Sequence, residues 1–333
     1  MTDKQIYQIG LTMINGVGDI LARHLLEALG DAEAVFTEKR QSLEKISGIG
    51  DSIIAEIKRA DVLLRAEKEL AFAQKNGISI YFLKDMNYPE RLRECPDAPV
   101  LFYFKGNADL NAAHIISVVG TRRASAYGQE VTERLLRDLS VIFPDLLVVS
   151  GLAYGIDICA HRNALKNQLP TVGVLAHGLD RIYPPVHRST AVEMLERGGL
   201  LTDFPSGTNP DRQNFIRRNR IVAGLADATI VIESAEKGGS LITCADDLIM
   251  AMRWDVAQKT DALPVQTQLL FPENEESERI LSFLEMRKES HINELSVALN
   301  LPVHQLSSLL FELELDGKIK SMPGSIYKRM KPL

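Results

Sequence analysis

Arginines and glycines gather at three places in this sequence where a run of β-branched residues ends. The three stretches are VVGTRRAS (residues 118–125), VVSGLAYGID (148–157) and FIRRNRIVAGLADATIVIESAEKGGSLIT (215–243). A guanidinium group offers two coplanar donors that match a phosphate, and glycine lets a ligand come close to backbone N–H groups. These residue types at these spacings indicate that the protein binds a phosphate chain at the rim of an open parallel sheet.

The predicted phosphate ligands are the small and basic residues at the ends of these strands. Arg122 and Arg123 follow a strand where the chain turns into a helix, so guanidinium groups and backbone donors are expected together. The three arginines of the RRNR run have an alternative interpretation as a solvated helix face, with Asn219 bracing the loop. The full set is Gly120, Thr121, Arg122, Arg123, Ser150, Gly151, Arg217, Arg218, Asn219, Arg220, Gly238, Gly239 and Ser240.

The sequence contains no convincing catalytic set. The seven histidines are dispersed, no GxSxG or HExxH motif occurs, and Ser150 has no base partner in the sequence. His161 fits a packed or capping histidine better than a base. We therefore expect a binding protein rather than an enzyme. The competing interpretation is a nucleotide-hydrolysing enzyme of the phosphoribohydrolase type, with Glu233 as the acid at a strand end.

Cofactor and metal sites are not expected either. The first loop reads GTRRAS instead of GxGxxG and has no acid placed to hold a ribose hydroxyl, which argues against a nicotinamide cofactor. Cys95, Cys159 and Cys244 are scattered and lack CxxC spacing. Core thiols are therefore a better interpretation than a zinc site or a disulfide framework.

Alternating strands and helices in the middle of the chain predict the fold class. Continuous apolar strands separated by amphipathic helices specify an α/β fold with a Rossmann-like, doubly wound parallel sheet. We assign this domain to residues 73–254, with residues 77–113 leading into it as one strand and a covering loop. One helix of the domain is expected over residues 217–226, and Asp157 is expected to cap the helix that begins beside it.

A short internal repeat marks a separate helical domain over residues 1–72. INGVGDILARHLLEALG (14–30) and ISGIGDSIIAEI (46–57) share a glycine-containing turn that is followed by an amphipathic helix. This pattern is typical of a helix-hairpin-helix or SAM-like domain, whose glycines let backbone N–H groups face a phosphate. The alternative is a helical packing domain that uses glycine only for tight turns.

The end of the chain is expected to form a linker and a winged helix. Residues 255–271 are polar and contain a proline, and residues 272–333 place three helices before a glycine-centred hairpin. The third of these helices carries His304, Gln305, Ser307 and Ser308 in place of arginines. Reading of DNA bases is therefore not indicated, and a module for protein contacts is at least as good an interpretation.

Charge and composition limit the kinds of partner. The formal net charge of -6 argues against a protein that coats duplex DNA over its whole surface. Residues 205–225, however, carry four arginines against one acid, and their field acts over a Debye length of about 10 Å. The sequence has no long apolar run and no signal-peptide pattern, so we expect a cytoplasmic protein without membrane contact.

Taken together, the motifs resemble the DNA-processing protein A (DprA, Smf) family. The stretches that carry the resemblance are VVGTRRAS, SGLAYGIDICAH, LAHGLDRIYP, RRNRIVAGL and KGGSLIT, with the approach NYPERLRECPDAPVLFYFKG. The resemblance covers roughly residues 80–243. It implies a Rossmann-like domain that binds single-stranded DNA, usually as a homodimer, and loads the RecA recombinase during natural transformation. Helical N-terminal and winged-helix C-terminal domains also occur in many members.

The resemblance assigns roles to individual residues. The Gly-Ser-Arg element of the family falls on residues 120–122, with Thr121 in place of serine, and makes Arg122 the first ligand for a DNA phosphate. The Arg-Asn-Arg element falls on residues 218–220. After the Tyr-Pro pair some members have a basic contact to DNA where this chain has Pro185. Arg181 or Arg188 is the expected replacement.

The chain departs from the family pattern after KGGSLIT. The family continues with a helix, another apolar strand ending in Pro-Gly, and a Gly-Cys-Asn segment, whereas here Thr243 runs straight into CADDLIMAMRWD. Loss of a central strand would leave a costly gap in a packed sheet. We therefore expect that a segment of the family's usual core is missing from this sequence.

Overall fold

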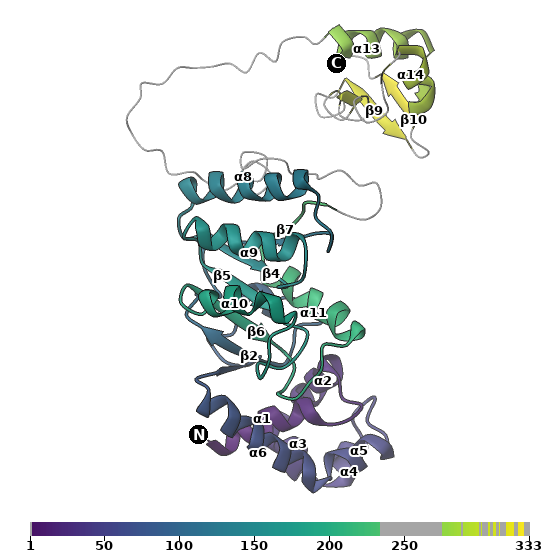
Figure 1. Cartoon of the computed structure of the whole chain (residues 1–333). Helices are drawn as coiled ribbons and strands as arrows, with labels where there is room; N and C mark the ends of the chain where they lie inside the picture. The colour runs from purple at the N-terminus through teal and green to yellow at the C-terminus, as the bar shows by residue number, and fades with distance from the viewer. Residues whose placement is uncertain are drawn as a thin grey trace, which may run out of the picture. The chain divides into compact units, whose positions relative to one another are not determined.

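The computed structural model contains two compact units, Met1–Ala257 and Gln258–Leu333, each with its own hydrophobic core (Figure 1). It describes residues 2–233, 275–287, 289–299, 301, 306, 309–310, 313, 318–322 and 326–329. The predicted ligands Gly238, Gly239 and Ser240 lie outside the described residues. So do Cys244, the predicted linker at residues 255–271, and the departure from the family pattern after Thr243.

Six helices form the start of the first unit. Gly16 and Gly48 both adopt a positive φ, of 82° and 87°, in turns closed by equivalent hydrogen bonds, Val17 N–H to Ile14 and Ile49 N–H to Ile46, each 3.1 Å long. The repeated motif therefore produces two turns of the same shape. The helices are α1 (Thr2–Met13), α2 (Asp19–Leu29), α3 (Ala32–Thr37), α4 (Arg40–Leu43), α5 (Asp51–Ile57) and α6 (Ala60–Lys75).

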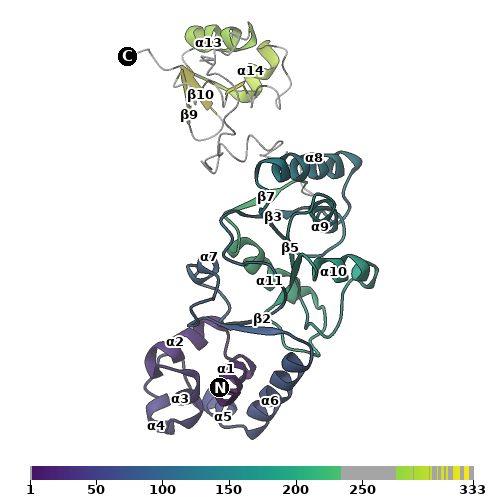
Figure 2. The ribbon, with the colours of Figure 1, turned by 90° about the vertical axis from the view of Figure 1, so that its left-hand side faces the viewer.

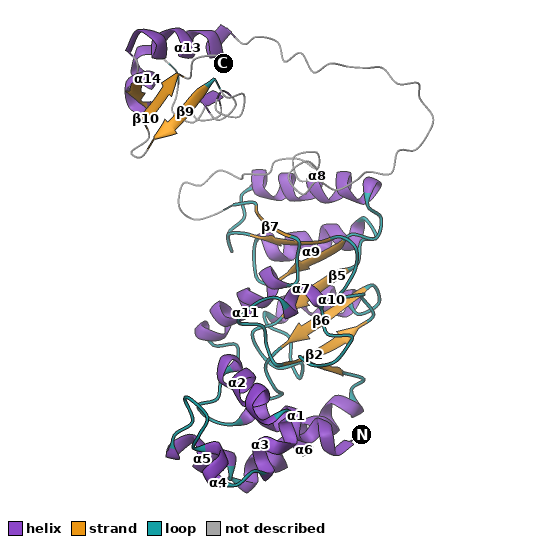
Figure 3. Ribbon diagram, turned by 180° about the vertical axis from the view of Figure 1, so that it is seen from behind, coloured by secondary structure: helices purple, strands orange, loops and turns teal. Residues whose placement is uncertain are grey.

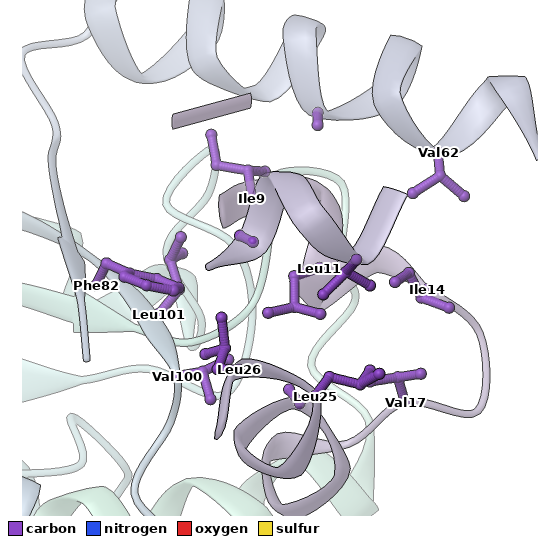
Figure 4. Packing of buried hydrophobic residues seen from close by; sticks show 14 of the residues in the cluster. Ile9, Leu11, Ile14, Val17, Leu25, Leu26, Val62, Phe82, Val100 and Leu101 are labelled. Atoms are coloured by element: carbon purple, nitrogen blue, oxygen red, sulfur yellow. The ribbon is translucent and has the colours of Figure 1, made fainter. Parts of the chain in front are cut away.

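The helices share one hydrophobic core with the edge of the sheet that follows them. Ile9, Leu11 and Leu25 are fully buried, and they belong to the same cluster as Phe82 and Leu101 (Figure 4). Because burial of apolar area is the main favourable term in folding, this shared core makes the helices and the sheet one structural body.

A seven-stranded sheet is the centre of the first unit, in the order β1-β2-β6-β5-β4-β3-β7. Five neighbouring strands run parallel, in registers such as Ile116 opposite Val148 and Val118 opposite Ile230. The strands are β1 (Ser79–Phe82), β2 (Leu101–Gly106), β3 (Ile115–Val119), β4 (Leu147–Ser150), β5 (Thr171–Val174), β6 (Gly198–Thr202) and β7 (Ala228–Val231). This arrangement confirms the predicted α/β fold class.

The antiparallel edge of the sheet differs from the single strand and covering loop that were predicted for residues 77–113. The segment expected to be a covering loop contains β2, which pairs antiparallel with both β1 and β6. Its residues 101–104 are all buried, and Tyr81 of β1 stacks on Phe102 with ring centroids 4.9 Å apart. The prolines at positions 96 and 99 led to the loop interpretation, but they lie before the strand, where no ladder hydrogen bond is lost.

Helices cover both faces of the sheet. Figure 2 shows α8, α9 and α10 on one side and α7 and α11 on the other. The helix α11 begins at Arg212, five residues before the predicted start, directly after Pro210 and Asp211. The helices are α7 (Glu90–Arg93), α8 (Ala126–Ile142), α9 (Ile156–Lys166), α10 (Arg188–Met194), preceded by the 3₁₀ turn Pro185–His187, and α11 (Arg212–Gly224).

The order of the strands creates a topological switch point beside β3. The chain moves from β3 through β4 and β5 to β6 in one direction and then returns through α11 to β7, on the other side of β3. In open α/β sheets, ligands bind outside the carboxyl ends of the strands at such a point. The loop at residues 120–125, which follows β3, lies at this position.

The second unit has the elements expected of a winged helix. Its described helices are α13 (Glu275–Arg287) and α14 (Ile292–Leu299), and its strands are β8 (Glu289–His291), β9 (Ile319–Met322) and β10 (Ile326–Arg329). The strands form an antiparallel sheet in the order β8-β10-β9, of which Figure 3 labels β9 and β10. Most of the predicted third helix, including His304, Gln305, Ser307 and Ser308, lies outside the described residues.

Membrane contact was not expected from the sequence. Within the part of the chain that the structure describes, no helix is both long enough and apolar enough to span a bilayer.

Gly155 and Gly207 offer a matched pair for testing how closely the loops of the switch point must pack. Both have φ near +81°, but a Cβ on Gly155 would collide with the backbone of Thr121 and Arg122, whereas a Cβ on Gly207 would meet nothing within 4 Å. We expect Gly207→Ala to lower the free energy of unfolding by about 1 kcal/mol, and Gly155→Ala to lower it by about 3 kcal/mol. Urea denaturation of both variants measures the difference, and equal losses would contradict the proposed close packing.

Candidate functional site

The candidate site is the rim formed by the loops that leave the carboxyl ends of the parallel strands. These loops are residues 120–125 after β3, 151–155 after β4, 175–184 after β5 and 203–211 after β6. Because neighbouring parallel strands end at the same edge of a sheet, loops far apart in sequence meet there. Most of the predicted site residues lie in these loops or on α11.

The first loop is held in place by its own backbone. Thr121 N–H donates to the carbonyl of Glu233 at 2.7 Å, and the carbonyl of Thr121 accepts from Ile156 N–H at 3.1 Å. The hydroxyl of Thr121 accepts from Arg123 N–H at 3.2 Å. Gly120 and Thr121 thus build the turn, and the exposed side chains of Arg122 and Arg123 project from a fixed backbone.

A carboxylate already occupies the start of α8. Glu233 Oε2 accepts from Ser125 N–H at 2.9 Å, and the Ser125 hydroxyl caps the helix by accepting from Gly128 N–H at 3.0 Å. In many Rossmann-like proteins this helix start is the place that binds a phosphate. Here the anion is a side chain of the protein, so a ligand phosphate must depend on the neighbouring guanidinium groups.

Ser150 and Gly151 are buried, and each is bonded to a protein group. The Ser150 hydroxyl donates to the carbonyl of Val118 at 2.6 Å, and Gly151 N–H donates to Asp157 Oδ2 at 3.1 Å. The predicted capping role of Asp157 is corrected, since Gly155 holds the N-cap position of α9. These contacts join β3, β4 and α9 beneath the rim.

Arg218 points into the protein below the same rim. The residue is 3% exposed, and its Nη1 donates to the carbonyl of Val174. Its guanidinium group also lies against Gly151, so that a Cβ at position 151 would collide with it. Burial lowers the pKa of Arg218 and raises the pKa of Asp157, and the attraction between these two charges opposes both shifts. Arg218 therefore anchors α11 to the ends of the strands.

Arg217 and Arg220 form ion pairs with two aspartates. Arg220 Nη2 lies 2.6 Å from Asp203 and 3.0 Å from Asp19, and Arg217 Nη2 lies 3.3 Å and 3.2 Å from the same carboxylates. The side chain of Asp203 is only 1% exposed. Burial raises the pKa of the Asp203 carboxyl, and both arginines oppose this shift. These two guanidinium groups thus neutralise carboxylates within the protein.

The first helical motif contributes directly to this arrangement. Asp19, the residue after the turn glycines of the GVGD motif, is the shared partner of Arg217 and Arg220, and its other oxygen accepts from Val100 N–H at 3.1 Å. A second contact comes from α6, where Glu69 accepts from the backbone N–H and the hydroxyl of Ser206 at 2.8 Å and 2.6 Å. The helices therefore hold both α11 and the loop that precedes it.

Helical geometry explains why the arginines of the RRNR run, residues 217–220, make different contacts. Successive residues of a helix point about 100° apart, whereas residues three apart share a face. Arg217 and Arg220 accordingly face the aspartates, Arg218 faces the sheet, and Asn219 is exposed. The run is therefore not a single basic surface.

One cluster at the rim joins a cation to two aromatic rings. The guanidinium carbon of Arg122 lies 5.4 Å from the centre of the Phe215 ring, and the Phe215 ring lies 6.0 Å from that of Tyr183. The three residues come from the loop after β3, the first turns of α11 and the loop after β5. Neither ring was predicted as a ligand, although both residues lie in the motifs FIRRNR and LDRIYP.

The two proposed replacements for a basic contact at Pro185 differ in their surroundings. Arg181 contacts Asp180 at 3.0 Å and donates to the side chain of Asn209 at 2.8 Å. Arg188 begins α10 and is exposed. Arg181 is thus held by protein partners.

The buried histidine His161 has a structural environment, as predicted from the sequence. Its Nε2 accepts from Leu152 N–H at 3.3 Å, and its Nδ1 lies 2.7 Å from the hydroxyl of Thr171, which itself donates to Val148. Burial, followed by the nearby Arg218, lowers the pKa of His161 to about 3. The neutral ring therefore connects the loop after β4 to strand β5.

The part of the chain that the structure describes contains no cluster of three or more acidic, histidine or cysteine side chains that could hold a metal. Its cysteines, Cys95 and Cys159, are free and partly buried. Burial raises the pKa of both thiols, so neither is activated as a nucleophile.

The fold and the rim define a Rossmann-like α/β protein with exposed arginines on a hydrogen-bonded turn at its topological switch point. The family described as DNA recombination-mediator protein A matches residues 79–254, more than half of the chain, and the DprA winged helix domain matches residues 264–325. The chain therefore belongs to the DprA/Smf family, which confirms the resemblance seen in its motifs.

Individual relatives agree with this assignment. The chain is 32% identical to Protein Smf of Synechocystis sp. over 72% of its own length, and 36% identical to DNA processing protein DprA of Bacillus subtilis over 52%. It spans 61% and 58% of the lengths of these two relatives. Its structure is similar to the X-ray structure of DprA from Streptococcus pneumoniae, with a TM-score of 0.54 and 30% identity, covering 74% of this chain and 84% of the other.

His161 generates a prediction about pH. Its pKa is about 3 in the folded protein against 6.5 for an ordinary histidine, so the unfolded chain binds the extra proton between these values. The stability that depends on the neutral ring is complete above about pH 6.5 and falls by about 1.4 kcal/mol per pH unit as the pH drops below it. We expect His161→Gln to lose this component, giving a flatter decline of the unfolding free energy between about pH 6 and pH 5. Parallel declines in the two proteins would contradict it.

Proposed function

We propose that this protein binds single-stranded DNA along the rim of its parallel sheet and delivers that strand to the RecA recombinase during natural transformation. Membership in the DprA/Smf family supports the assignment to DNA processing. The observation that carries the binding role is the exposed pair Arg122 and Arg123, which projects from a hydrogen-bonded turn at the topological switch point. The proposed location is the cytoplasm, where such a partner acts.

The proposed contacts are to phosphate and are independent of sequence. A guanidinium group binds a phosphate through two parallel N–H donors and carries no information about the base. Arg122 and Arg123 can bind neighbouring phosphates because, among the described residues, neither is paired with a carboxylate. Phosphate contacts of this kind release counterions, so the affinity must fall as salt rises.

Delivery to RecA and assembly as a homodimer are the parts of the proposal that rest on the family alone. Both can be tested together with the full chain. Sedimentation with and without an oligonucleotide gives the number of copies bound, and the rate at which RecA forms filaments on the same oligonucleotide gives the delivery activity. A monomer that leaves the filament rate unchanged would overturn this part of the proposal.

The competing assignment, a nucleotide-hydrolysing enzyme, requires a carboxylate that faces the ligand. Glu233 was the proposed carboxylate for the sugar, but its Oε2 accepts from Ser125 N–H at 2.9 Å and its carbonyl accepts from Thr121 N–H. That side chain builds the loop instead of facing a ligand. Release of free base from nucleoside monophosphates would nevertheless identify such an enzyme directly.

Arg122 tests the phosphate contacts, with Arg137 as the matched control. Arg137 is 59% exposed on α8 and is paired with Asp138 away from the rim. We expect Arg122→Ala to weaken binding of a fluorescent oligonucleotide and to reduce the slope of log affinity against log salt by about 0.7, the loss of one phosphate contact. Arg137→Ala should leave both quantities unchanged. Equal slopes for Arg122→Ala and the unmodified protein would show that Arg122 does not contact a phosphate.

Arg220 is expected to behave differently from Arg122. Its removal would leave the buried Asp203 without its nearest cation, so Arg220→Ala should lower the free energy of unfolding by about 3 kcal/mol. Folded Arg220→Ala protein should retain the salt slope of strand binding, because the guanidinium group is already paired. Chemical denaturation and the same salt titration check both statements. If Arg220→Ala has normal stability and a reduced slope of log affinity against log salt, Arg220 binds a phosphate after all.

A further inference from the structure

The geometry points to a positioning pair, Arg91 and Asp227, at the edge of the sheet opposite the rim. The pair holds the amino end of β7 and, through that strand, fixes the loop that carries Arg122. This inference rests on the proposed binding of a DNA strand. It adds two residues that set the affinity for the strand without touching it.

The positioning pair joins three segments of the chain at the amino ends of two parallel strands. Arg91 Nε donates to Asp227 Oδ1 at 2.5 Å, and Arg91 Nη2 donates to Asp227 Oδ2 at 3.1 Å. The same guanidinium group donates to the carbonyls of Ala112 and Ala113 at 3.0 Å and 3.1 Å. Asp227 Oδ2 also accepts from Ile115 N–H, and Asp227 N–H donates to the Ile115 carbonyl, both at 2.8 Å. The pair therefore ties α7 to the starts of β3 and β7.

The strand that follows Asp227 has few other contacts. β7 pairs with β3 and, among the described residues, with no other strand, so the backbone on its outer edge has no ladder partner there. Its Ile230 is buried, whereas Thr229 and Val231 are exposed. The Thr229 hydroxyl accepts from that of Ser117 at 2.8 Å. Since packing holds only one face of this strand, the positioning pair is needed to fix its amino end.

The other end of β7 supports the loop after β3. Glu233, two residues beyond the strand, accepts from Thr121 N–H through its carbonyl at 2.7 Å and from Ser125 N–H through its carboxylate at 2.9 Å. Thr121 and Ser125 bracket the two exposed arginines of this loop. β7 has four residues and spans about 13 Å between the positioning pair and the rim. A loosened Asp227 therefore loosens the support of both arginines.

Positioning and direct electrostatics predict opposite results for loss of the Asp227 carboxylate. Asp227→Asn removes a negative charge, so a purely electrostatic effect would tighten the binding of DNA. The carboxamide cannot accept from both Arg91 and Ile115 N–H as the carboxylate does, because one of its two groups is itself a donor. The contact opens, and the apparent dissociation constant rises in inverse proportion to the fraction of molecules whose loop is in place.

The first test measures binding of a fluorescent thymidine oligonucleotide to the full chain. We expect Asp227→Asn and Arg91→Ala each to bind about fivefold more weakly than the unmodified protein, as for a loop in place in about one molecule in five. The slope of log affinity against log salt should stay the same, because the bound state keeps its phosphate contacts. The double variant should be no weaker than either single variant, since both changes break one contact.

The second test follows the loop without DNA, by hydrogen exchange of single amides. In Asp227→Asn and Arg91→Ala we expect the N–H groups of Thr121 and Ser125 to lose their protection. Val148 N–H, which donates to a backbone carbonyl at 3.0 Å in the centre of the sheet, should stay protected in both variants.

Two further variants serve as controls, after circular dichroism has established that each protein is folded. Ile57→Val shortens a buried side chain of α5 and lowers the stability without touching β7, so it should leave strand binding and the protection of the loop unchanged. Arg91→Lys keeps the charge but not the planar fork, so its affinity should lie between those of Arg91→Ala and the unmodified protein.

The outcomes separate the positioning pair from the proposed function. If Asp227→Asn binds the strand as tightly as the unmodified protein, the positioning role is overturned and the phosphate rim stands. Weaker binding with Thr121 and Ser125 still protected also overturns it. So does a reduced salt slope in Arg91→Ala, which would make Arg91 a direct phosphate ligand. An unmodified protein that binds no strand overturns both proposals.

Discussion

The position of α11 is the constraint on which the candidate site depends. This helix carries Phe215 to the rim, and charges anchor it on two sides, Arg218 at the strand ends and Arg217 with Arg220 at two aspartates. Breaking a buried ion pair by removing one partner is strongly destabilising because it leaves an unpaired charge. The anchors thus fix the direction of the helix, and through it the place of the ring that supports Arg122.

The helices at the start of the chain take part in this anchoring. Asp19 bonds to the α11 arginines, and Glu69 holds Ser206 in the loop before that helix. Their core is continuous with the first strands of the sheet. In the motif that was expected to present glycine turns to a phosphate, the aspartate Asp19 makes a contact within the same structural body.

The sequence predicted the fold class, the alternation of parallel strands with helices and the loop that carries Arg122, because periodicity and small residues at strand ends are local signals. Prediction from the sequence failed for contacts between residues that lie far apart along the chain. The RRNR run looked uniformly basic, but the acids at positions 19 and 203 pair with Arg217 and Arg220, and the face of the helix that carries Arg218 is turned to the sheet. Strand β2 was missed partly for a similar reason, since one of its two pairing partners, β6, stands about a hundred residues away in the sequence.

For the proposed binding of a DNA strand, the width of the parallel part of the sheet would limit how many nucleotides one chain contacts. Neighbouring strands lie about 4.8 Å apart, so the edge from β6 to β7 is about 19 Å wide. Stacked nucleotides advance about 3.4 Å each, so a polynucleotide crossing this edge has about six of them in reach of one chain. Protection of a longer strand would need many copies side by side, and their spacing along the polymer would be governed by the number of parallel strands in each.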